Sequence, residues 1–243
     1  IRRPPRSTLS SSSAASDVYK RQLLKKGEFE ESKKYKRTDV INKILSKRSN
    51  DTIYLEIGVR NPEDNFYTVK SSLKYSVDPG LEVKTNKADF KLTSDEFFKQ
   101  LRAGKILSKD CRFDVIFIDG LHEYSQVRKD ALNSLDCIDE NGWIAFHDFL
   151  PANYLEQHIP RLGNGWPWTG DCWKLAYELS QAKNIEFKIV EIDRGVGLMK
   201  KISNDYFVPD LSDILLRSEF DKFLEILDEL PICSFEEAIN LIG

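Results

Sequence analysis

The sequence predicts an α/β fold in which helices cover both faces of a mostly parallel sheet. Short apolar runs of strand length, such as residues 53–58 and 113–118, alternate with segments of helical periodicity. These runs are apolar almost throughout, which is typical of strands buried on both faces of a parallel sheet. The chain has 243 residues, enough to bury the core of one such domain with extensions and without disulfides.

The elements follow one another along the chain. Strands are predicted at residues 53–58, 75–78, 88–92, 113–118, 142–146, 187–192 and 196–200. Helices are predicted over residues 39–47, 94–104, 127–135 and 171–182. The run at 88–92 is the weakest strand signal. Asp193-Arg194-Gly195 is a hairpin signal between the last two runs, so we expect the sheet to end in an antiparallel pair.

The two ends of the chain differ from its middle. Residues 1–22 are basic and serine-rich, and they lack the apolar region of a secretory signal. They resemble a translated sequencing adapter fused to a metagenomic reading frame, so we expect a non-native, disordered segment. Residues 23–51 are predicted to form a helical lead-in, 52–202 the main domain, and 203–243 a helical extension.

The C-terminal extension carries a Leu/Phe stripe near period 3.6 over residues 211–227, which predicts a helix that ends before Pro231. Ser234 and Glu237 form a capping box for a last short helix. The stripe is compatible with core packing or with a homodimer contact.

Composition narrows the class of protein. The net charge is −3, which gives no general basic character for nucleic acid. The four cysteines are widely spaced and include no CxxC pair, which fits neither a zinc site nor a dense disulfide framework. No apolar run approaches the roughly 20 residues that a membrane-spanning helix needs. We expect a cytoplasmic protein with free thiols and no membrane or nucleic-acid partner.

Acidic residues and a glycine stand where predicted strands end. Glu56 and Gly58 end the first strand, and Asp78 ends the second. Ligands of doubly wound sheets bind beyond the carboxyl ends of the strands, where a carboxylate can hold a ribose. These residues alone indicate a nucleotide-like ligand, and strand capping is the alternative.

A second group of polar residues ends two later strands. Asp119 and His122 follow residues 113–118, and His147-Asp148 follows residues 142–146. Histidine titrates near neutral pH and suits a general base. Aspartate and histidine are also ligand types of a divalent metal. Alternatively, His122 caps a helix and His147 packs under a loop.

The ordered series of motifs resembles the class I S-adenosylmethionine (SAM)-dependent methyltransferases, in particular the methyltransferase-24 type. The resemblance spans roughly residues 37–201 and rests on YLEIGV, YSVDPG, TSDEFF, FDVIFIDGLHEY, GWIAFHDFLP, GDCWK and DRGVGLM. It implies a Rossmann-like, doubly wound, mostly parallel seven-stranded sheet with an antiparallel last strand, plus helical N- and C-terminal extensions.

The resemblance also implies roles for individual residues. The residues that match cofactor-binding positions are Glu56, Gly58, Arg60, Asp78, Thr93, Ser94 and Asp119. The sequence departs from the family at Arg60-Asn61-Pro62, which replaces the later glycines of the first motif. Arg60 is expected either to pair with the carboxylate of the cofactor or to lie on the surface in a structural role.

The function implied is O-methylation of a hydroxyl on a small molecule or glycan, with SAM as cofactor. The catalytic candidates are Asp119, His122 and His147, and the ligands for a divalent metal such as Mg²⁺ are Asp119, His147 and Asp148. The alternative is a non-catalytic SAM- or nucleotide-binding protein of a polysaccharide or natural-product pathway. A nicotinamide-dependent oxidoreductase is disfavoured because G-x-G-x-x-G is missing after the first strand. The loop over 150–170 is expected to cover the acceptor, with Tyr154, Trp166 and Trp168 as stacking or packing residues.

Overall fold

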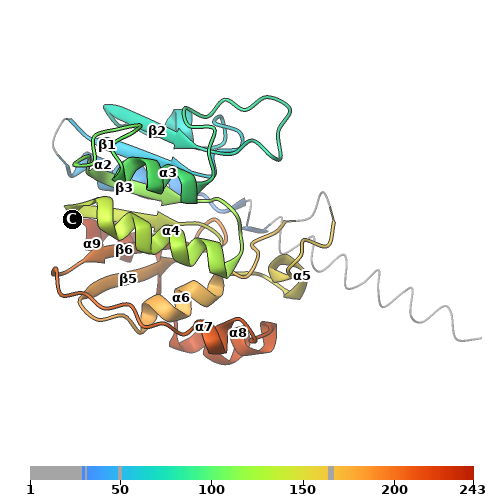
Figure 1. The fold of residues 1–243 in the computed structure, drawn as a ribbon. Helices are drawn as coiled ribbons and strands as arrows, with labels where there is room; N and C mark the ends of the chain where they lie inside the picture. Colours follow the sequence, from blue (N-terminus) through green and yellow to red (C-terminus); the bar gives the residue numbers. More distant parts are fainter. Residues whose placement is uncertain (1–28, 31, 49–50, 164–166) are drawn as a thin grey trace, which may run out of the picture.

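The protein folds around one mixed sheet (Figure 1). The computed structural model describes residues 29–30, 32–48, 51–163 and 167–243. Within these residues the sheet has seven strands in the order β2-β1-β3-β4-β6-β5-β7. The strands are β1 (Ile53–Ile57), β2 (Leu73–Val77), β3 (Phe113–Ile118), β4 (Ile138–Phe146), β5 (Ile185–Val190), β6 (Val196–Lys201) and β7 (Ile232–Cys233).

Strand β6 runs against the direction of the other strands. Neighbouring strands from β2 through β4 pair in parallel, β6 pairs antiparallel with both β4 and β5, and β7 pairs in parallel with β5. The predicted Rossmann-like, mostly parallel sheet with an antiparallel pair is confirmed. The predicted strands at the candidate site, fourth and fifth along the chain, are β3 and β4.

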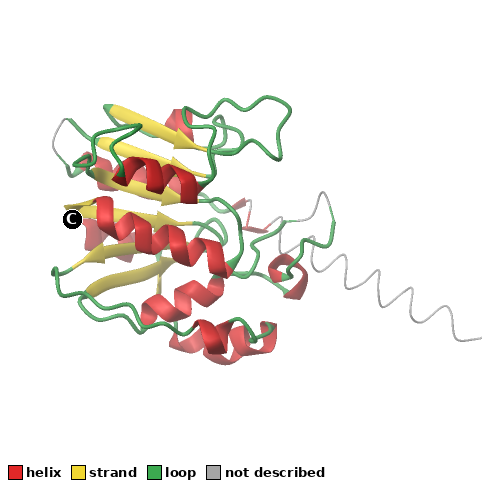
Figure 2. Cartoon of the chain, viewed as in Figure 1, coloured by secondary structure: helices red, strands yellow, loops and turns green. Residues whose placement is uncertain are grey.

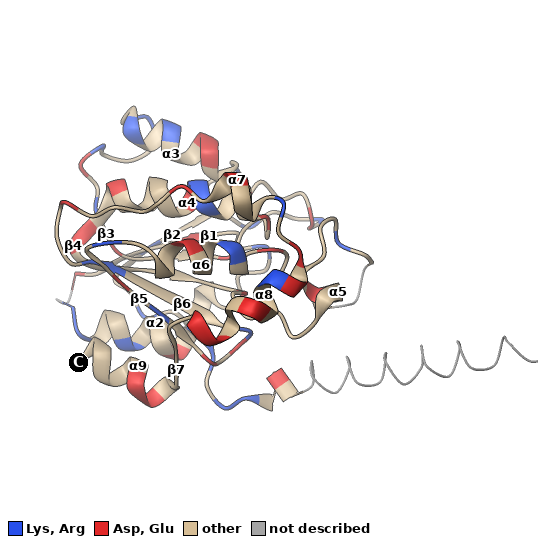
Figure 3. Cartoon of the chain, turned by 90° about the horizontal axis from the view of Figure 1, so that it is seen from below, with Lys and Arg blue, Asp and Glu red and all other residues tan. Residues whose placement is uncertain are grey.

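Helices form a layer on each face of the sheet (Figure 2). One layer holds α3 (Ser94–Arg102), α4 (Tyr124–Cys137) and α6 (Trp173–Ser180), and the other holds α2 (Arg37–Ser46) and α9 (Phe235–Ile242). Figure 3 shows the sheet between these layers, with acidic and basic residues interspersed on the helices. The shorter helices are η1 (Phe66–Thr68), α5 (Tyr154–Gln157), α7 (Ser212–Leu215), α8 (Phe220–Ile226) and η2 (Leu227–Glu229).

The apolar core lies on both faces of the sheet. Every residue of β3 is buried. Ile116 and Ile118 pack into the core under α3, α4 and α6, whereas Val115 and Phe117 pack into the core under α2 and α9. This alternation follows from the two-residue period of a strand and explains why β3 is apolar at every position except Asp114, which pairs with Arg48. None of the described helices is both long enough and apolar enough to cross a bilayer.

The predicted strand at residues 88–92 is wrong. Phe90 makes a single bridge to Val77. Next to it, the carboxylate of Asp89 accepts hydrogen bonds from the backbone N–H and the hydroxyl of Ser76, at 2.9 and 2.7 Å. Because a side chain takes the place of a backbone acceptor, the ladder does not continue.

The C-terminal extension is not entirely helical. It supplies β7, the seventh strand of the sheet. The apolar stripe over 211–227 forms α7, α8 and η2 in place of one helix. Ser218 lies at the break, where its hydroxyl donates to the carbonyl of Ile214 at 3.1 Å, a local bond that competes with helix continuation.

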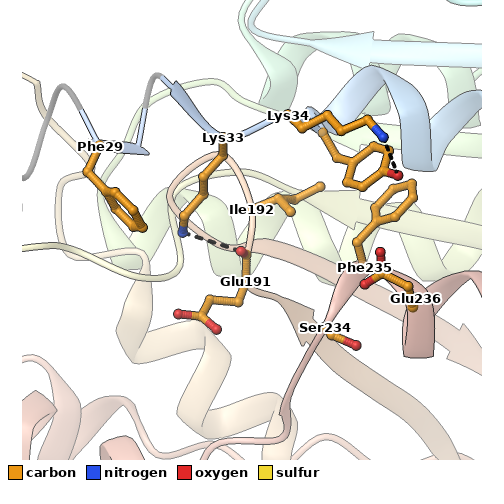
Figure 4. A pocket seen from close by; sticks show the side chains of 9 residues that line it. Phe29, Lys33, Lys34, Glu191, Ile192, Ser234, Phe235 and Glu236 are labelled. Atoms are coloured by element: carbon orange, nitrogen blue, oxygen red, sulfur yellow. Dashed lines mark hydrogen bonds between the residues drawn. The ribbon is translucent and has the colours of Figure 1, made fainter.

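The described part of the lead-in packs beside β5 and α9. The ring of Tyr35 stacks on Phe235 with centroids 3.7 Å apart, and Lys33 Nζ donates to the carbonyl of Glu191 at 3.3 Å. These residues line a shallow cavity of about 330 Å³ (Figure 4). The packing brings the first residue of α2, Arg37, close to the turn between β5 and β6. Residues 1–28 lie outside the described residues, so the expectation for 1–22 stays a prediction.

Candidate functional site

The carboxyl ends of β3 and β4 bring the predicted acidic and histidine residues together. Asp119 follows β3, and His147 and Asp148 follow β4. Nδ1 of His147 lies 3.3 Å from Oδ1 of Asp119 and 3.3 Å from Oδ1 of Asp148. Residues from two neighbouring parallel strands meet because these strands end at the same edge of the sheet.

His122 completes this cluster from the loop before α4. Its Nδ1 lies 2.9 Å from the carbonyl oxygen of Trp168 and 3.3 Å from Oδ2 of Asp148. A carbonyl oxygen only accepts, so Nδ1 carries a hydrogen. The other nitrogen, Nε2, lies 3.2 Å from Oδ1 of Asp119. A proton on Nε2, or a cation shared by Nε2 and the carboxylate, satisfies both atoms.

The cluster contains a set of atoms that suits a divalent cation. One ligand atom from each of Asp119, His122 and Asp148 lies within 4.8 Å of the others. The Asp148 side chain is 5% exposed, and its Oδ1 has no hydrogen-bond partner among the described residues. An orphaned buried carboxylate oxygen beside two other ligands fits a metal. This set contains His122, whereas the predicted set contains His147.

Two residues that the sequence analysis did not assign to the site also reach the cluster. Nη1 of Arg37, at the start of α2, lies 2.9 Å from Oδ2 of Asp193 and 3.2 Å from Nε2 of His147. Asp193 lies in the turn before β6 and was noted only as part of a hairpin signal. In the sequence, Asp193 carries only the turn signal, and Arg37 lies before the predicted helix over 39–47 with no signal of a role in the site.

Burial and neighbouring charges act on the ionisable groups in opposite directions. Burial raises the pKa of Asp119, but His147, His122 and Arg37 together hold it well below its usual value. Burial lowers the pKa of His122, whereas Asp119 and Asp148 raise it by more. Burial likewise lowers the pKa of His147, but Asp148 and Asp119 raise it by more, so that it lies well above its usual value. The carboxylate of Asp119 is therefore ionised beside two histidines.

Glu56 lies on β1 in a buried hydrogen-bond network. Its Oε2 accepts from the hydroxyl of Tyr54 at 2.6 Å and from Nδ2 of Asn65 at 2.8 Å. Thr38, on α2, donates to Oδ1 of Asn65 at 2.6 Å. Burial raises the pKa of Glu56 to about 7, although the bonds from Tyr54 and Asn65 oppose that rise.

Gly58 brings the end of β1 against the end of β3. Its φ is +87°, and a Cβ would overlap the backbone of Asp119 and Gly120. A side chain does not fit between the two strand ends. The close approach that this glycine permits in the structure is to the protein backbone beside Asp119, whereas the sequence analysis expected a ligand there.

The second predicted acid, Asp78, organises the loop after β1. Its Oδ2 accepts from the backbone N–H of Arg60 at 2.8 Å, and its Oδ1 accepts from that of Gly80 at 2.6 Å. The Arg60 side chain is 57% exposed and lies 3.6 Å from Asp64, which is the surface position that the sequence analysis left open.

The remaining predicted residues lie at the start of α3 and in the loop over 150–170. Thr93 is the N-cap of α3, and the Ser94 hydroxyl accepts from Gln126 at 3.1 Å. The Trp168 ring stacks on His122 with centroids 5.2 Å apart. The Tyr154 ring packs edge-on against Phe220. Trp166 lies outside the described residues.

The family comparison covers the strand ends described above. Residues 56–149 match the model of the methyltransferase-24 family, described as a methyltransferase domain. The match confirms the predicted resemblance to class I SAM-dependent methyltransferases. No curated protein matches the chain.

Solved structures of methyltransferases share low similarity with the chain. MycE methyltransferase from the mycinamycin biosynthetic pathway, in complex with Mg and SAH, is 16% identical, with a TM-score of 0.42 over 67% of this chain and 48% of that one. The present chain therefore spans about half the length of MycE. An O-methyltransferase from Bacillus cereus in complex with SAH is 13% identical, with a TM-score of 0.42 over 74% and 90% of the two chains. SAH-bound PaMTH1 from Podospora anserina is 15% identical, with a TM-score of 0.39 over 82% and 99%.

The raised pKa of Glu56 predicts a pH-dependent effect on the stability of the protein. A carboxyl group whose pKa rises from 4.5 to about 7 on folding is stabilising below pH 4.5, and this contribution is lost as the pH rises to about 7. Glu56→Gln keeps an acceptor for Tyr54 and Asn65 without the buried charge. Relative to wild type, we expect its free energy of unfolding to rise between pH 5 and pH 8, by up to about 3 kcal/mol.

Urea unfolding of the ligand-free protein across this pH range measures the difference. Exposed Glu82 supplies the control variant Glu82→Gln, for which we expect a flat difference. A flat difference for Glu56→Gln as well contradicts the prediction.

Proposed function

We propose that the protein is a SAM-dependent methyltransferase that transfers a methyl group to a hydroxyl of a small molecule or glycan. The carrying observation is the cluster of Asp119, His122 and Asp148 at the carboxyl edge of the sheet, within or beside strands of the segment that matches a methyltransferase family. This is the edge at which doubly wound sheets bind ligands.

Methyl transfer to a hydroxyl needs alignment and a proton acceptor. The acceptor oxygen forms a bond to the methyl carbon while the carbon–sulfur bond breaks, and the hydroxyl proton leaves. Asp119 and His122 are 18% and 19% exposed, more than His147 at 10% and Asp148 at 5%. In the proposal the proton passes to the Asp119–His122 pair, since these two side chains are best placed to meet a bound acceptor.

The proposed cofactor site runs from β1 to the start of α3. In the proposal, Glu56 and Gly58 contact the methionine part of SAM, with Arg60 nearby, and Asp78 contacts the ribose. Thr93 and Ser94 contact the adenine. The hydrogen bond from the Arg60 backbone to Asp78 supports the proposal, since it holds the carboxylate proposed to bind the ribose beside the end of β1.

A divalent metal fits the same edge of the sheet. Asp119, His122 and Asp148 would hold it, with His147 of the predicted ligand set lying against both carboxylates. When bound, such an ion would lower the pKa of the acceptor hydroxyl and orient it.

Removal of metal tests this part of the proposal. We expect EDTA to abolish methyl transfer and added Mg²⁺ to restore it, because the ion would supply the positive charge beside Asp119 and Asp148. The measurement is transfer from labelled SAM before and after EDTA, with S-adenosylhomocysteine affinity as the control for an intact cofactor site. If EDTA does not change the rate of methyl transfer, the proposed metal requirement is wrong, whereas the proposed proton acceptor is unaffected.

Calorimetry with S-adenosylhomocysteine and with NAD tests the function itself. We expect S-adenosylhomocysteine to bind and NAD not to bind. Labelled SAM with a panel of phenols and sugars then identifies an acceptor. Tight NAD binding without a response to S-adenosylhomocysteine would reject the proposal, and binding without transfer to any member of the panel would favour the non-catalytic alternative.

A further inference from the structure

Asp171, in the turn before α6, contacts the loop that carries His122. Its backbone N–H donates to the carbonyl of His122 at 3.2 Å, and its Oδ1 accepts from the backbone N–H of Tyr124 at 2.6 Å. Asp171 thus holds two backbone groups at the start of α4, although it lies 47 positions from Tyr124 in the chain. Helices α4 and α6 are neighbours in one layer (Figure 1).

The carboxylate of Asp171 supplies a cap that α4 does not obtain from its own sequence. The N–H groups of a first helical turn have no partner within the helix. The N-cap residue of α4, Glu123, makes no side-chain cap hydrogen bond. A carboxylate is also favoured at this end by the helix dipole. The start of α4 is therefore fixed by a residue from another segment.

The side chain of Asp171 is itself held in place. Its Oδ2 lies 2.9 Å from Nζ of Lys174, and the side chains of Lys174 and Asp171 are 7% and 13% exposed. Each carboxylate oxygen therefore has its own partner. The carboxylate cannot turn away from Tyr124 without also losing this ion pair.

Residues beside Asp171 contact both the backbone and the ring of His122. A Cβ at Gly170 would overlap the carbonyl oxygen of His122, so the two backbones lie in direct contact there. The carbonyl oxygen of Trp168 lies 2.9 Å from Nδ1 of His122, and the two rings stack. The backbone contacts are the same in every protonation state of the ring. Segment 168–171 thus places the ring whose Nε2 lies 3.2 Å from Asp119.

The same segment is bound to α5, in the loop that is expected to cover the acceptor. The backbone N–H groups of Thr169 and Gly170 donate to the carbonyl of Glu156 at 2.9 and 3.1 Å. Nε1 of Trp173 donates to Oε1 of Gln157 at 3.2 Å. The support of His122 therefore extends to this loop.

We propose that Asp171 is a positioning residue, which holds the backbone at His122 and Tyr124 so that the His122 ring stays beside Asp119 and within reach of the acceptor hydroxyl. This inference rests on the proposed methyltransferase function. In the proposal Asp171 touches neither the acceptor nor the cofactor, whose proposed site comes from other elements. Its removal should therefore slow methyl transfer and leave cofactor affinity unchanged.

Two double variants that differ only at position 171 test the inference. Both carry Lys174→Met, which removes the buried cation that would otherwise lose its partner and keeps an unbranched side chain. In this background Asp171→Asn keeps an oxygen that can accept from Tyr124, whereas Asp171→Ala removes it. The comparison isolates the acceptor of the cap.

Hydrogen exchange at the Tyr124 amide, followed by NMR of the nitrogen-15-labelled full chain, measures the contact directly. In wild type we expect slow exchange, since the Asp171 carboxylate is the partner of this amide. We expect exchange to be about tenfold faster in the Asp171→Ala double variant and close to wild type in the Asp171→Asn double variant. Equal exchange rates in the two double variants overturn the inference.

Kinetics with the acceptor found from the panel supply the second readout. We expect the Asp171→Ala double variant to lower kcat and kcat/KM by the same factor, about 10–100-fold, with KM unchanged. The reason is that a displaced His122 weakens the transition state and not the binding of substrate. The Asp171→Asn double variant is expected to retain most of the wild-type kcat, and both should keep wild-type affinity for S-adenosylhomocysteine.

Ser234→Ala is the matched control, because Ser234 caps α9 in the other helix layer. It should lower the Tm by a few degrees without changing kcat. Equal kcat values in the two double variants, or a loss of S-adenosylhomocysteine affinity in step with kcat, would overturn the inference. Failure of the proposed function shows separately, as absence of S-adenosylhomocysteine binding to wild type while exchange at Tyr124 still depends on Asp171.

Discussion

Replacing Asp119 by asparagine is expected to slow methyl transfer by about 10²–10⁴-fold. The carboxylate is held ionised by His147, His122 and Arg37, and it contacts both histidines at 3.2–3.3 Å. Asparagine keeps the size of the side chain but removes the charge that favours proton transfer from the acceptor, and it offers one oxygen in place of two.

Initial rates from labelled SAM measure this effect, and thermal unfolding establishes that the variant is folded. Asp213→Asn removes an exposed carboxylate at a distant helix, and we expect it to retain wild-type rates. Full turnover by Asp119→Asn would remove Asp119 from the catalytic assignment.

Gly170→Ala is expected to lower the free energy of unfolding by about 3–4 kcal/mol, through backbone strain and overpacking together. Gly170 has a φ of +56°, and a Cβ there would overlap the carbonyl oxygen of His122. The backbone of Asp171 donates to that same carbonyl at 3.2 Å. The loop that follows α5 and the segment that carries His122 must therefore move apart to admit a methyl group.

Gly104→Ala is a matched control, because Gly104 has a φ of +64° and nothing within 4 Å of an added Cβ. It should cost only the strain of the left-handed backbone, about 1 kcal/mol. The melting temperature should fall by about 10 °C for Gly170→Ala and by a few degrees for the control. Equal shifts in the two variants would contradict the packing argument. Because the overlap displaces His122, we also expect Gly170→Ala to lose activity below its melting temperature.

The parts of the fold that were predictable have strong local patterns. The run of β3, which is apolar except for Asp114, and the hairpin signal before β6 identified a parallel sheet with an antiparallel pair. By contrast, β7 is a strand of two residues, Ile232 and Cys233, too short for a period to be recognised. At 88–92 apolar and polar residues alternate as in a strand, but the Asp89 carboxylate replaces the backbone as the partner of Ser76. The pattern of apolar residues cannot reveal such a replacement.

The sequence predicted the residues of the candidate site that follow strands, but it did not predict the two that reach the site by tertiary packing. Asp119, His122, His147 and Asp148 end recognisable strands or follow them directly, so the topology of a parallel sheet brings them together. Arg37 and Asp193 are 156 residues apart in the chain, and each has an ordinary local role, at a helix start and in a turn. Their meeting depends on tertiary packing, which includes the stack of Tyr35 on Phe235.

The reversed strand β6 has a consequence for the order of folding. As the chain emerges from the ribosome, β4 is an open edge with unpaired backbone groups until β6 has been made and has paired with it. The Arg37–Asp193 contact joins residues that are 156 positions apart in the chain. Its formation therefore costs loop-closure entropy. We therefore expect the region around His147 to be among the last parts to become ordered during synthesis. A partly made chain would expose the β4 edge to other chains while it still lacked the ion pair beside His147.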